Sequence, residues 1–268
     1  MPRRRFTPEA LPHHRGLWTP PRLGVSVAAA DERLRSRSQV LAAELELPLA
    51  DKGGAGFDLL LVVTETGLEL QETGPGRPGP VRVGFGGAGE TDHRRATASR
   101  REPLALAVGL KRRRPTVFDA TTGLGRDAFQ LMGLGCTVTA IERSPVLGVM
   151  LRDALDRSAC TSIRLLVGDA REVLAGLPTG EAPDVVYLDP MLPPKKKWAL
   201  AKKEMRILRR LVGDDPDAGA LLAVAKGVAR DRVVVKRTPR TPPLAPAPSM
   251  SYKGKIARYD VYLTHGGG

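Results

Sequence analysis

Hydrophobic and polar positions follow two different periods along the second half of the chain, and these periods predict the elements of the fold. Short apolar runs rich in Val, Ile and Leu predict buried strands, and apolar residues that recur every three or four positions predict helices. The predicted strands span residues 117–119, 137–142, 163–167, 184–188 and 232–237, with helices expected after the glycine turn at 123–125, from Ser144-Pro145 onward and over 195–212. This alternation predicts a doubly wound, mostly parallel sheet that binds ligands at the carboxyl ends of its strands.

Residues 250–263 close this pattern with a predicted antiparallel hairpin that turns at Lys253-Gly254-Lys255. With the hairpin, the fold class is α/β, with a mostly parallel, seven-stranded sheet. Such a hairpin at the end of a parallel sheet is a feature of the S-adenosylmethionine methyltransferase (Rossmann-like) fold. Dinucleotide dehydrogenases usually lack it. We therefore assign residues 99–268 to one S-adenosylmethionine-dependent methyltransferase domain.

The first part of the chain has a different character. Residues 1–24 carry arginines among prolines without a hydrophobic period, which predicts a basic disordered arm. Residues 25–98 predict a small N-terminal α/β lobe. Its predicted elements are a helix over 31–47, a hairpin formed by 57–64 and 68–70, and a strand over 81–85.

The glycine turn after the first strand of the large domain carries the clearest chemical signal. Gly123, Gly125 and Ala128 have the spacing of a G-x-G-x-x-[GA] motif at a helix start. Glycines there let the backbone turn tightly and approach a ligand. Glu142 ends the next strand, where a carboxylate can accept hydrogen bonds from both hydroxyls of a ribose. The setting predicts a cofactor that contains a nucleoside.

A dinucleotide and S-adenosylmethionine both fit this setting, and Asp119 distinguishes between them. In dinucleotide folds the pyrophosphate lies on the helix N-terminus, where an acid would repel it. Here Asp119 ends the strand four residues before Gly123, and Arg126-Asp127 occupies the first helical turn. An acid at that position suits the cationic amino group of a methionine moiety. We therefore expect S-adenosylmethionine as the cofactor.

The overall charge points to an anionic partner. Lys and Arg outnumber Asp and Glu by 42 to 29, which gives a formal net charge of +13. Such an excess favours nucleic acid, and a membrane is less expected because no long amphipathic basic helix stands apart from the fold. The expected contacts are basic clusters, which lie at Arg94-Arg95, Arg100-Arg101, Lys111 to Arg114, and Lys202, Arg206, Arg209 and Arg210.

Other classes of site find little support in the sequence. Cys136 and Cys160 are the two cysteines, and the four histidines are scattered without metal-ligand spacing. We therefore expect no disulfide framework and no metal site. The apolar runs are too short to span a bilayer, and without a recognisable signal peptide we expect a cytoplasmic protein.

Asp189 and Pro190 are the predicted catalytic residues. Methyl transfer is an in-line displacement, so the protein must place acceptor and sulfonium in contact. An exocyclic amine on a base is a weak nucleophile because its lone pair is delocalised into the ring. The carboxylate of Asp189 can hold one N–H of that amine and offset its developing positive charge, and the carbonyl of Pro190 can accept the second N–H. An Asp-Pro pair can also merely end a strand with a turn.

Several blocks of the sequence together resemble the RsmJ family. They are DATTGLGRDAF, IERSP, VVYLDPMLP, KKEMRILRRLVG, VVVKR with PPLA, the Gly-Gly at 86–87 with His93-Arg94-Arg95, and KGKIARYDVY. The resemblance implies methylation of a guanine N2 in small-subunit (16S) ribosomal RNA, either free or in the assembled small ribosomal subunit. It implies cofactor contacts at Arg126, Asp127, Glu142, Arg143, Asp169, Ala170 and Asp189.

Two departures from the family pattern bear on the substrate and the cofactor. Leu192 stands where the family usually has a phenylalanine that could stack on the target base, and Asp169-Ala170 stands where a serine pair is common. An acid at 169 could bond the adenine amino group of the cofactor.

The alternatives to a guanine-N2 methyltransferase are an adenine-N6 methyltransferase acting on RNA or DNA, an NAD-dependent oxidoreductase, and a non-catalytic RNA-binding factor. The sequence does not predict an oligomeric state.

Overall fold

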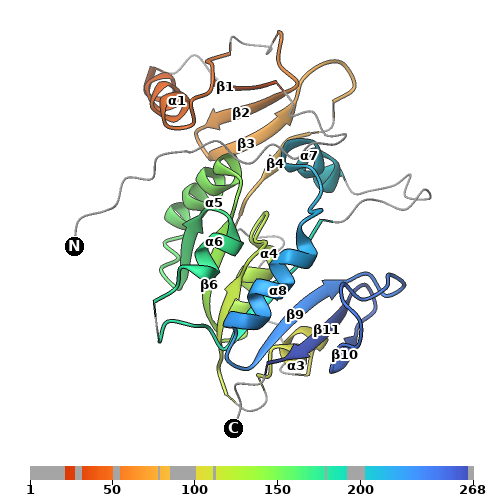
Figure 1. Cartoon of the computed structure of the whole chain (residues 1–268). Coiled ribbons are helices and arrows are strands. Elements are labelled where there is room, and N and C mark those ends of the chain that lie inside the picture. Colours follow the sequence, from red (N-terminus) through yellow and green to blue (C-terminus); the bar gives the residue numbers. More distant parts are fainter. Residues whose placement is uncertain are drawn as a thin grey trace.

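The computed structural model describes residues 22–27, 32–50, 55–77, 79–84, 101–110, 113–178, 180–191 and 203–264. These residues form a four-stranded sheet near the N-terminus and a seven-stranded sheet in the rest of the chain. Figure 1 shows the small lobe above the larger sheet, with helices α5 (Pro145–Arg157) and α7 (Lys203–Val212) between them. Within the described residues, no helix is long and apolar enough to cross a membrane.

The larger sheet has the strand order β10-β11-β9-β8-β5-β6-β7. Its strands are β5 (Thr116–Asp119), β6 (Thr137–Glu142), β7 (Ile163–Val167), β8 (Val185–Leu188), β9 (Arg232–Arg237), β10 (Met250–Lys253) and β11 (Arg258–Leu263). The first five are mutually parallel, while β11 runs antiparallel to both β9 and β10. The predicted fold class and the closing hairpin are confirmed.

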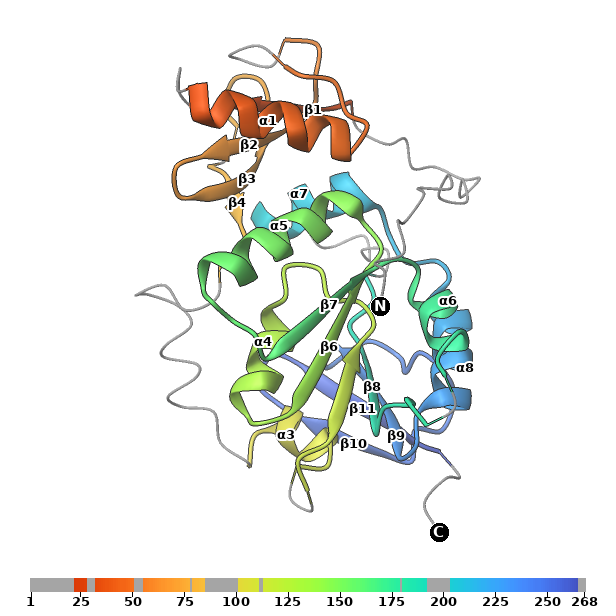
Figure 2. The ribbon, with the colours of Figure 1, turned by 90° about the vertical axis from the view of Figure 1, so that its left-hand side faces the viewer.

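Helices cover both faces of this sheet. Consecutive strand residues point to opposite faces, so Val117 and Val185 pack in one core while Phe118 and Val186 pack in the other. The helices are α3 (Pro103–Ala107) and α4 (Arg126–Gly133) with α5 and α7 on the first core, and α6 (Ala170–Ala175) and α8 (Ala218–Val228) on the second. Figure 2 shows α4 on one side of the strands and α6 and α8 on the other.

The small lobe consists of α1 (Glu32–Glu44) and the sheet β1-β2-β3-β4. Its strands are β1 (Leu23–Val27), β2 (Leu59–Thr64), β3 (Gly67–Glu72) and β4 (Val81–Arg82). Strands β2 and β3 pair as the predicted antiparallel hairpin, and β1 runs parallel to β2.

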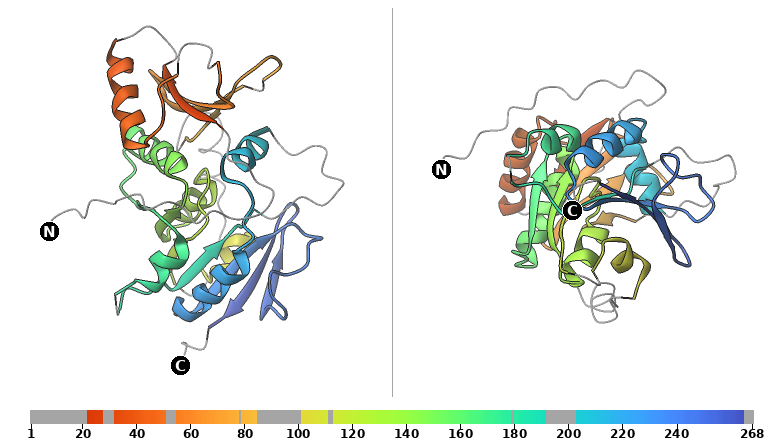
Figure 3. Two further views of the ribbon diagram at one scale, coloured as in Figure 1. Left: turned by 45° about the horizontal axis from the view of Figure 1, so that its top comes forward. Right: turned by 60° about the horizontal axis from the view of Figure 1, so that its bottom comes forward.

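A buried carboxylate on α5 joins the lobe to the larger domain. Asp153 accepts hydrogen bonds from the guanidinium of Arg37 on α1, from the Arg157 side chain (2.9 Å) and from the main-chain N–H of Leu68 on β3 (3.1 Å). Burial would raise the pKa of Asp153, but the two guanidinium groups lower it below its ordinary value. Figure 3 shows α1 lying beside α5 from a further direction. This contact fixes the lobe against the large sheet.

Several predicted boundaries differ from the structure. Residues 1–21 of the predicted basic arm and residues 195–202 of the predicted helix 195–212 lie outside the described residues, and β1 begins at Leu23, inside the predicted arm. Strand β4 covers the first two residues of the predicted strand 81–85. Helix α8 was not predicted, because its run of Ala, Gly, Leu and Val has no polar face to give a helical period.

Candidate active site

A cavity of about 290 Å³ lies at the carboxyl ends of β5, β6 and β8 and beside the N-terminus of α6. The sequence-predicted site residues that line it are Asp119, Gly123, Arg126, Asp127, Glu142, Arg143, Asp169, Ala170, Asp189 and Pro190. Gly125 does not line it and instead forms the N-cap of α4. The topology brings these residues together because parallel strands end at one edge of a sheet.

The glycine turn forms one wall of this cavity. Gly123 has φ 57° and Gly125 has φ 76°, a conformation that favours glycine. A Cβ added at Gly123 would meet no atom nearer than the main-chain oxygen of Thr121, at 4.0 Å. The glycine is therefore required by its backbone angle, and the space beside the turn is open to a ligand.

Glu142 holds this turn in place from the end of β6. Its two carboxylate oxygens accept the main-chain N–H groups of Gly123 (2.8 Å) and Ser144 (2.7 Å). Burial raises the pKa of Glu142 to about 7, and the two N–H groups oppose that rise. Each carboxylate oxygen can accept a second hydrogen bond, so the group can still receive ligand hydroxyls.

Asp119 is the most deeply buried acid in the cavity wall, with 1% of its surface exposed. Burial and then the nearby charge of Asp127 raise its pKa well above the ordinary value, while the N–H of Thr121 opposes them. A cationic ligand group placed here would stabilise the ionised carboxylate. The site therefore suits an ammonium group.

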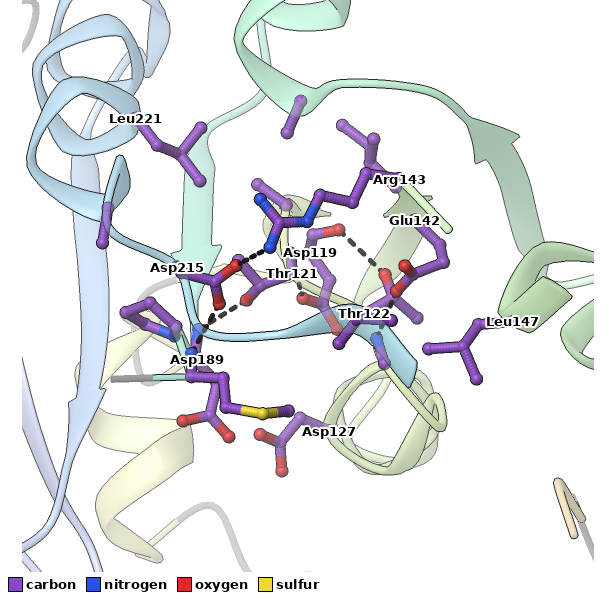
Figure 4. A pocket seen from close by; sticks show the side chains of 18 of the residues that line it. Asp119, Thr121, Thr122, Asp127, Glu142, Arg143, Leu147, Asp189, Asp215 and Leu221 are labelled. Atoms are coloured by element: carbon purple, nitrogen blue, oxygen red, sulfur yellow. Dashed lines mark hydrogen bonds and ion pairs between the residues drawn. The ribbon is translucent and has the colours of Figure 1, made fainter. Parts of the chain in front are cut away.

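The segment that contains Asp189 is held from two sides. The N–H of Asp189 donates to Thr121 Oγ1 (2.6 Å), and the N–H of Met191 donates to Asp215 Oδ2 (2.6 Å). Asp215 also pairs with Arg143 at 2.5 Å, and its own N–H donates to the carbonyl of Met191 (2.7 Å). In Figure 4, Asp189 lies beside Asp127, and Glu142 lies farther across the view. The cavity thus has a Glu142 side and an Asp189 side.

Asp127 lies in a cluster with Tyr187 and Lys236, two residues that were not predicted as part of the site. The Asp127 carboxylate accepts from the buried hydroxyl of Tyr187 (2.7 Å) and from the ammonium of Lys236 (2.7 Å). Lys236 also lies 2.9 Å from Asp189 Oδ2. A lysine near the end of the apolar run VVVKR was the available signal, because a cation in a buried strand requires an acidic partner.

Asp169 is already engaged with Arg171. It forms the N-cap of α6, where Oδ1 accepts the Arg171 N–H (2.8 Å) and Oδ2 pairs with the Arg171 guanidinium (2.6 Å). The hydrogen bond from the Arg171 side chain lowers the pKa of Asp169 despite partial burial. The anionic carboxylate keeps acceptor capacity toward the cavity, and its contact with an adenine amino group stays a prediction.

Arginines in two of the predicted RNA-binding clusters have acidic partners within the chain. Arg206 and Arg210 reach Glu72 at 3.3 Å each, Arg209 pairs with Asp214 at 2.7 Å, and Arg113 pairs with Asp184 at 2.9 Å. Arg206 and Arg210 therefore fasten α7 to β3. Lys111, Arg112 and Lys202 lie outside the described residues, as do Arg94-Arg95 and Leu192.

The described part of the chain contains no group of three or more His, Cys, Asp or Glu side chains that could hold a metal ion. The acids of the cavity are instead paired with N–H groups, guanidinium groups and the Lys236 ammonium.

Comparison with known proteins gives consistent results. The family described as putative SAM-dependent methyltransferase matches residues 41–264. The protein named ribosomal RNA small subunit methyltransferase J from Thioalkalivibrio sulfidiphilus is 49% identical over 90% of this chain and 98% of its own, and the one from Pseudomonas fluorescens is 45% identical over 89% and 94%. A crystal structure of a SAM-dependent methyltransferase from Neisseria gonorrhoeae covers 91% of this chain and 98% of its own at 32% identity, with a TM-score of 0.64.

Proposed function

This chain belongs to the ribosomal RNA small subunit methyltransferase J family, whose enzymes use S-adenosylmethionine, and on that premise we propose that it methylates the exocyclic N2 of a guanine in small-subunit ribosomal RNA. The observation that carries the proposal is the carboxylate of Asp189. It ends a strand at the cavity, its side chain is 41% exposed, and its main chain is held by Thr121.

The acids of the cavity fit S-adenosylmethionine. Glu142 retains acceptor capacity for ribose hydroxyls, and Asp119 offers a buried carboxylate to the methionine ammonium. Arg126, Asp127, Arg143, Asp169 and Ala170 complete the proposed binding wall around the glycine turn. Bound S-adenosylmethionine supplies a methyl group activated by a positively charged sulfur.

Asp189 and Pro190 act on the acceptor amine. The Asp189 carboxylate accepts one N–H of the guanine N2 amine, and the carbonyl of Pro190 accepts the other, which orients the nitrogen lone pair for in-line attack. With S-adenosylmethionine held by Glu142 and Asp119, the lone pair would form the new C–N bond at the expense of the C–S bond, whose electron pair would remain on sulfur. The extra proton on N2 would then pass to the Asp189 carboxylate and from there to solvent.

The charge of the chain supports an RNA substrate. Its formal net charge of +13 favours a polyanion, and the names of its relatives specify ribosomal RNA of the small subunit. The choice of guanine N2 over adenine N6 rests on the resemblance of the Y-L-D-P-M segment, residues 187–191, to the RsmJ family.

The test is methylation of unmodified small subunits and of RNA stripped from them, with the product nucleoside identified by mass spectrometry. Asp189→Asn should lower turnover by about a hundredfold to a thousandfold, the usual cost of one preorganised electrostatic group. Asp156→Asn on the exposed surface of α5 is the matched control. N2-methylguanosine made by the parent and lost in Asp189→Asn supports the proposal. N6-methyladenosine would identify the alternative reaction, and full activity in Asp189→Asn would refute the role of this acid.

A further inference from the structure

Lys236 on β9 contacts both acids on the Asp189 side of the cavity. Its Nζ lies 2.7 Å from Asp127 Oδ2 and 2.9 Å from Asp189 Oδ2. We propose that Lys236 is a positioning residue for methyl transfer, which holds Asp189 ionised by pairing with Oδ2 and leaves Oδ1 for the acceptor amine. This inference rests on the proposed function, and it adds a residue that acts through Asp189.

The sheet explains how Lys236 reaches this place. Strands β8 and β9 are parallel, with Leu188 opposite Val235, so Lys236 lies level with Asp189 at the carboxyl edge. Side chains alternate along a strand, so Lys236 shares a face with Val234, which packs in the core that also contains Tyr187. The same face carries α4 and its Asp127. A lysine at this register is therefore directed at the acid cluster.

A cation beside Asp189 stabilises its ionised form. Two carboxylates held within reach of one another disfavour each other's ionised form unless a positive charge lies between them. Burial alone would lower the pKa of Lys236, but Asp189 and Asp127 raise it above its ordinary value, so the side chain is a cation at neutral pH. The titratable and charged groups near the Asp189–Lys236 pair are Asp119, Asp127, Tyr187, Asp215, Arg237 and Tyr259.

The hydrogen bonds of Asp127 also hold the Lys236 ammonium in position beside Asp189. Asp127 Oδ2 accepts from Lys236 and from the hydroxyl of Tyr187, whose side chain is fully buried. Lys236 is thus connected through Asp127 to a fully buried core residue. Burial raises the pKa of Asp189, and the Lys236 ammonium opposes that rise. Without the ammonium, the pKa of Asp189 would rise further and its carboxylate would lose the contact that orients it. Both effects reduce the fraction of Asp189 that can accept the amine.

The experiment compares Lys236→Met and Lys236→Arg with the parent enzyme in the small-subunit methylation assay. Lys236→Met should lower kcat on the order of tenfold to a hundredfold, less than the loss of Asp189 itself, and should move the acid limb of the kcat profile upward by about one pH unit. Lys236→Arg should show a smaller loss in kcat and a smaller shift of the acid limb than Lys236→Met. The control is Lys226→Met, because Lys226 lies on the exposed side of α8 over the ring of Tyr262.

A double-mutant cycle separates this role from a general effect on folding. If Lys236 acts through Asp189, adding Lys236→Met to the Asp189→Asn variant should change the residual rate by less than about twofold. An equal loss in both backgrounds, or an unchanged acid limb in Lys236→Met, would overturn the inference.

A second readout does not depend on turnover. Carbon-13 NMR of aspartate carboxyl groups in the cofactor-free protein should show the Asp189 signal, identified by its loss in Asp189→Asn, titrating at a higher pH in Lys236→Met than in the parent. Identical titrations would overturn the inference even if the parent methylates RNA. A parent that methylates no RNA would instead refute the proposed function and leave the titration to decide the pairing.

Discussion

Glu142 should make the cofactor-free protein less stable as the pH rises toward neutrality. Burial raises its pKa from 4.5 to about 7, so between these values the folded protein binds a proton that the unfolded chain has lost. The free energy of unfolding therefore falls as the pH rises through this window. Each unit of difference between the two pKa values corresponds to about 1.4 kcal/mol, so the free energy of unfolding should fall by about 3 kcal/mol across this window.

The cofactor-free protein favours the protonated form of Glu142, and binding of S-adenosylmethionine should favour the ionised form. Ribose hydroxyls that donate to Glu142 favour its ionised form, so affinity should increase with pH. If the group has a pKa of about 7 in the free protein and stays ionised in the complex, the dissociation constant should be about tenfold smaller near pH 8 than near pH 6. Isothermal titration calorimetry at several pH values measures this directly.

Glu142→Gln provides the comparison because glutamine has the same shape and does not titrate. It keeps one acceptor for the Gly123 and Ser144 N–H groups and places an amide NH₂ against the other, so we expect a loss of about 1 to 3 kcal/mol in the free energy of unfolding. The informative quantity is the pH slope rather than this constant loss. Glu172→Gln, on the exposed side of α6, is the matched control.

Urea unfolding of the parent and both variants from about pH 5 to about pH 8 tests the linkage. The stability of the parent relative to Glu142→Gln should decline with increasing pH, and Glu172→Gln should follow the parent. Parallel curves for the parent and Glu142→Gln, together with an affinity for S-adenosylmethionine that does not change with pH, would refute the reasoning.

Two further predictions concern the surface and the lobe. Binding to small-subunit RNA should weaken steeply as the salt concentration rises. Replacing Lys111 and Arg112 by Gln should reduce the slope of log K against log salt by about 0.7 to 0.9 for each phosphate that is no longer neutralised. An unchanged slope would show that these two side chains contact water and not RNA. Asp153→Ala should lower the free energy of unfolding by about 1 to 3 kcal/mol, because the N–H of Leu68 loses its buried acceptor, whereas water can solvate the half-exposed Arg37 and Arg157. Urea unfolding measures this against Asp156→Ala as the control, and coinciding curves for the two variants would contradict it.

The fold of the seven-stranded sheet could be predicted from the sequence because the local signals of its strands and turns agree with that fold. The alternation of strands and helices, the turn at Gly123 and the hairpin at residues 250–263 each depend on neighbouring residues. The acids at strand ends could be placed in one cavity because parallel strands bring their carboxyl ends together. Their roles toward the cofactor and the RNA remain proposals.

Interactions between distant segments could not be predicted from local patterns. Lys236 looks like the end of an apolar strand, and only the register of β9 beside β8 brings it to Asp189, 47 positions earlier in the chain. Arg206 and Arg210 look like a solvated or RNA-binding helix face, yet both reach Glu72 of the small lobe. Asp215 likewise gains its partner Arg143 through the crossover that follows α7.

The ion pairs of α7 limit how far the two parts of this chain can be treated as separate modules. Arg206 and Arg210 are fixed to Glu72, and Arg210 also reaches Asp58 at 3.1 Å. A shortened chain that lacks the lobe would deprive these arginines of those acceptors and would expose the apolar side of α5 to water. A larger sheet separated from this lobe would therefore need other acidic groups to receive the arginines of α7.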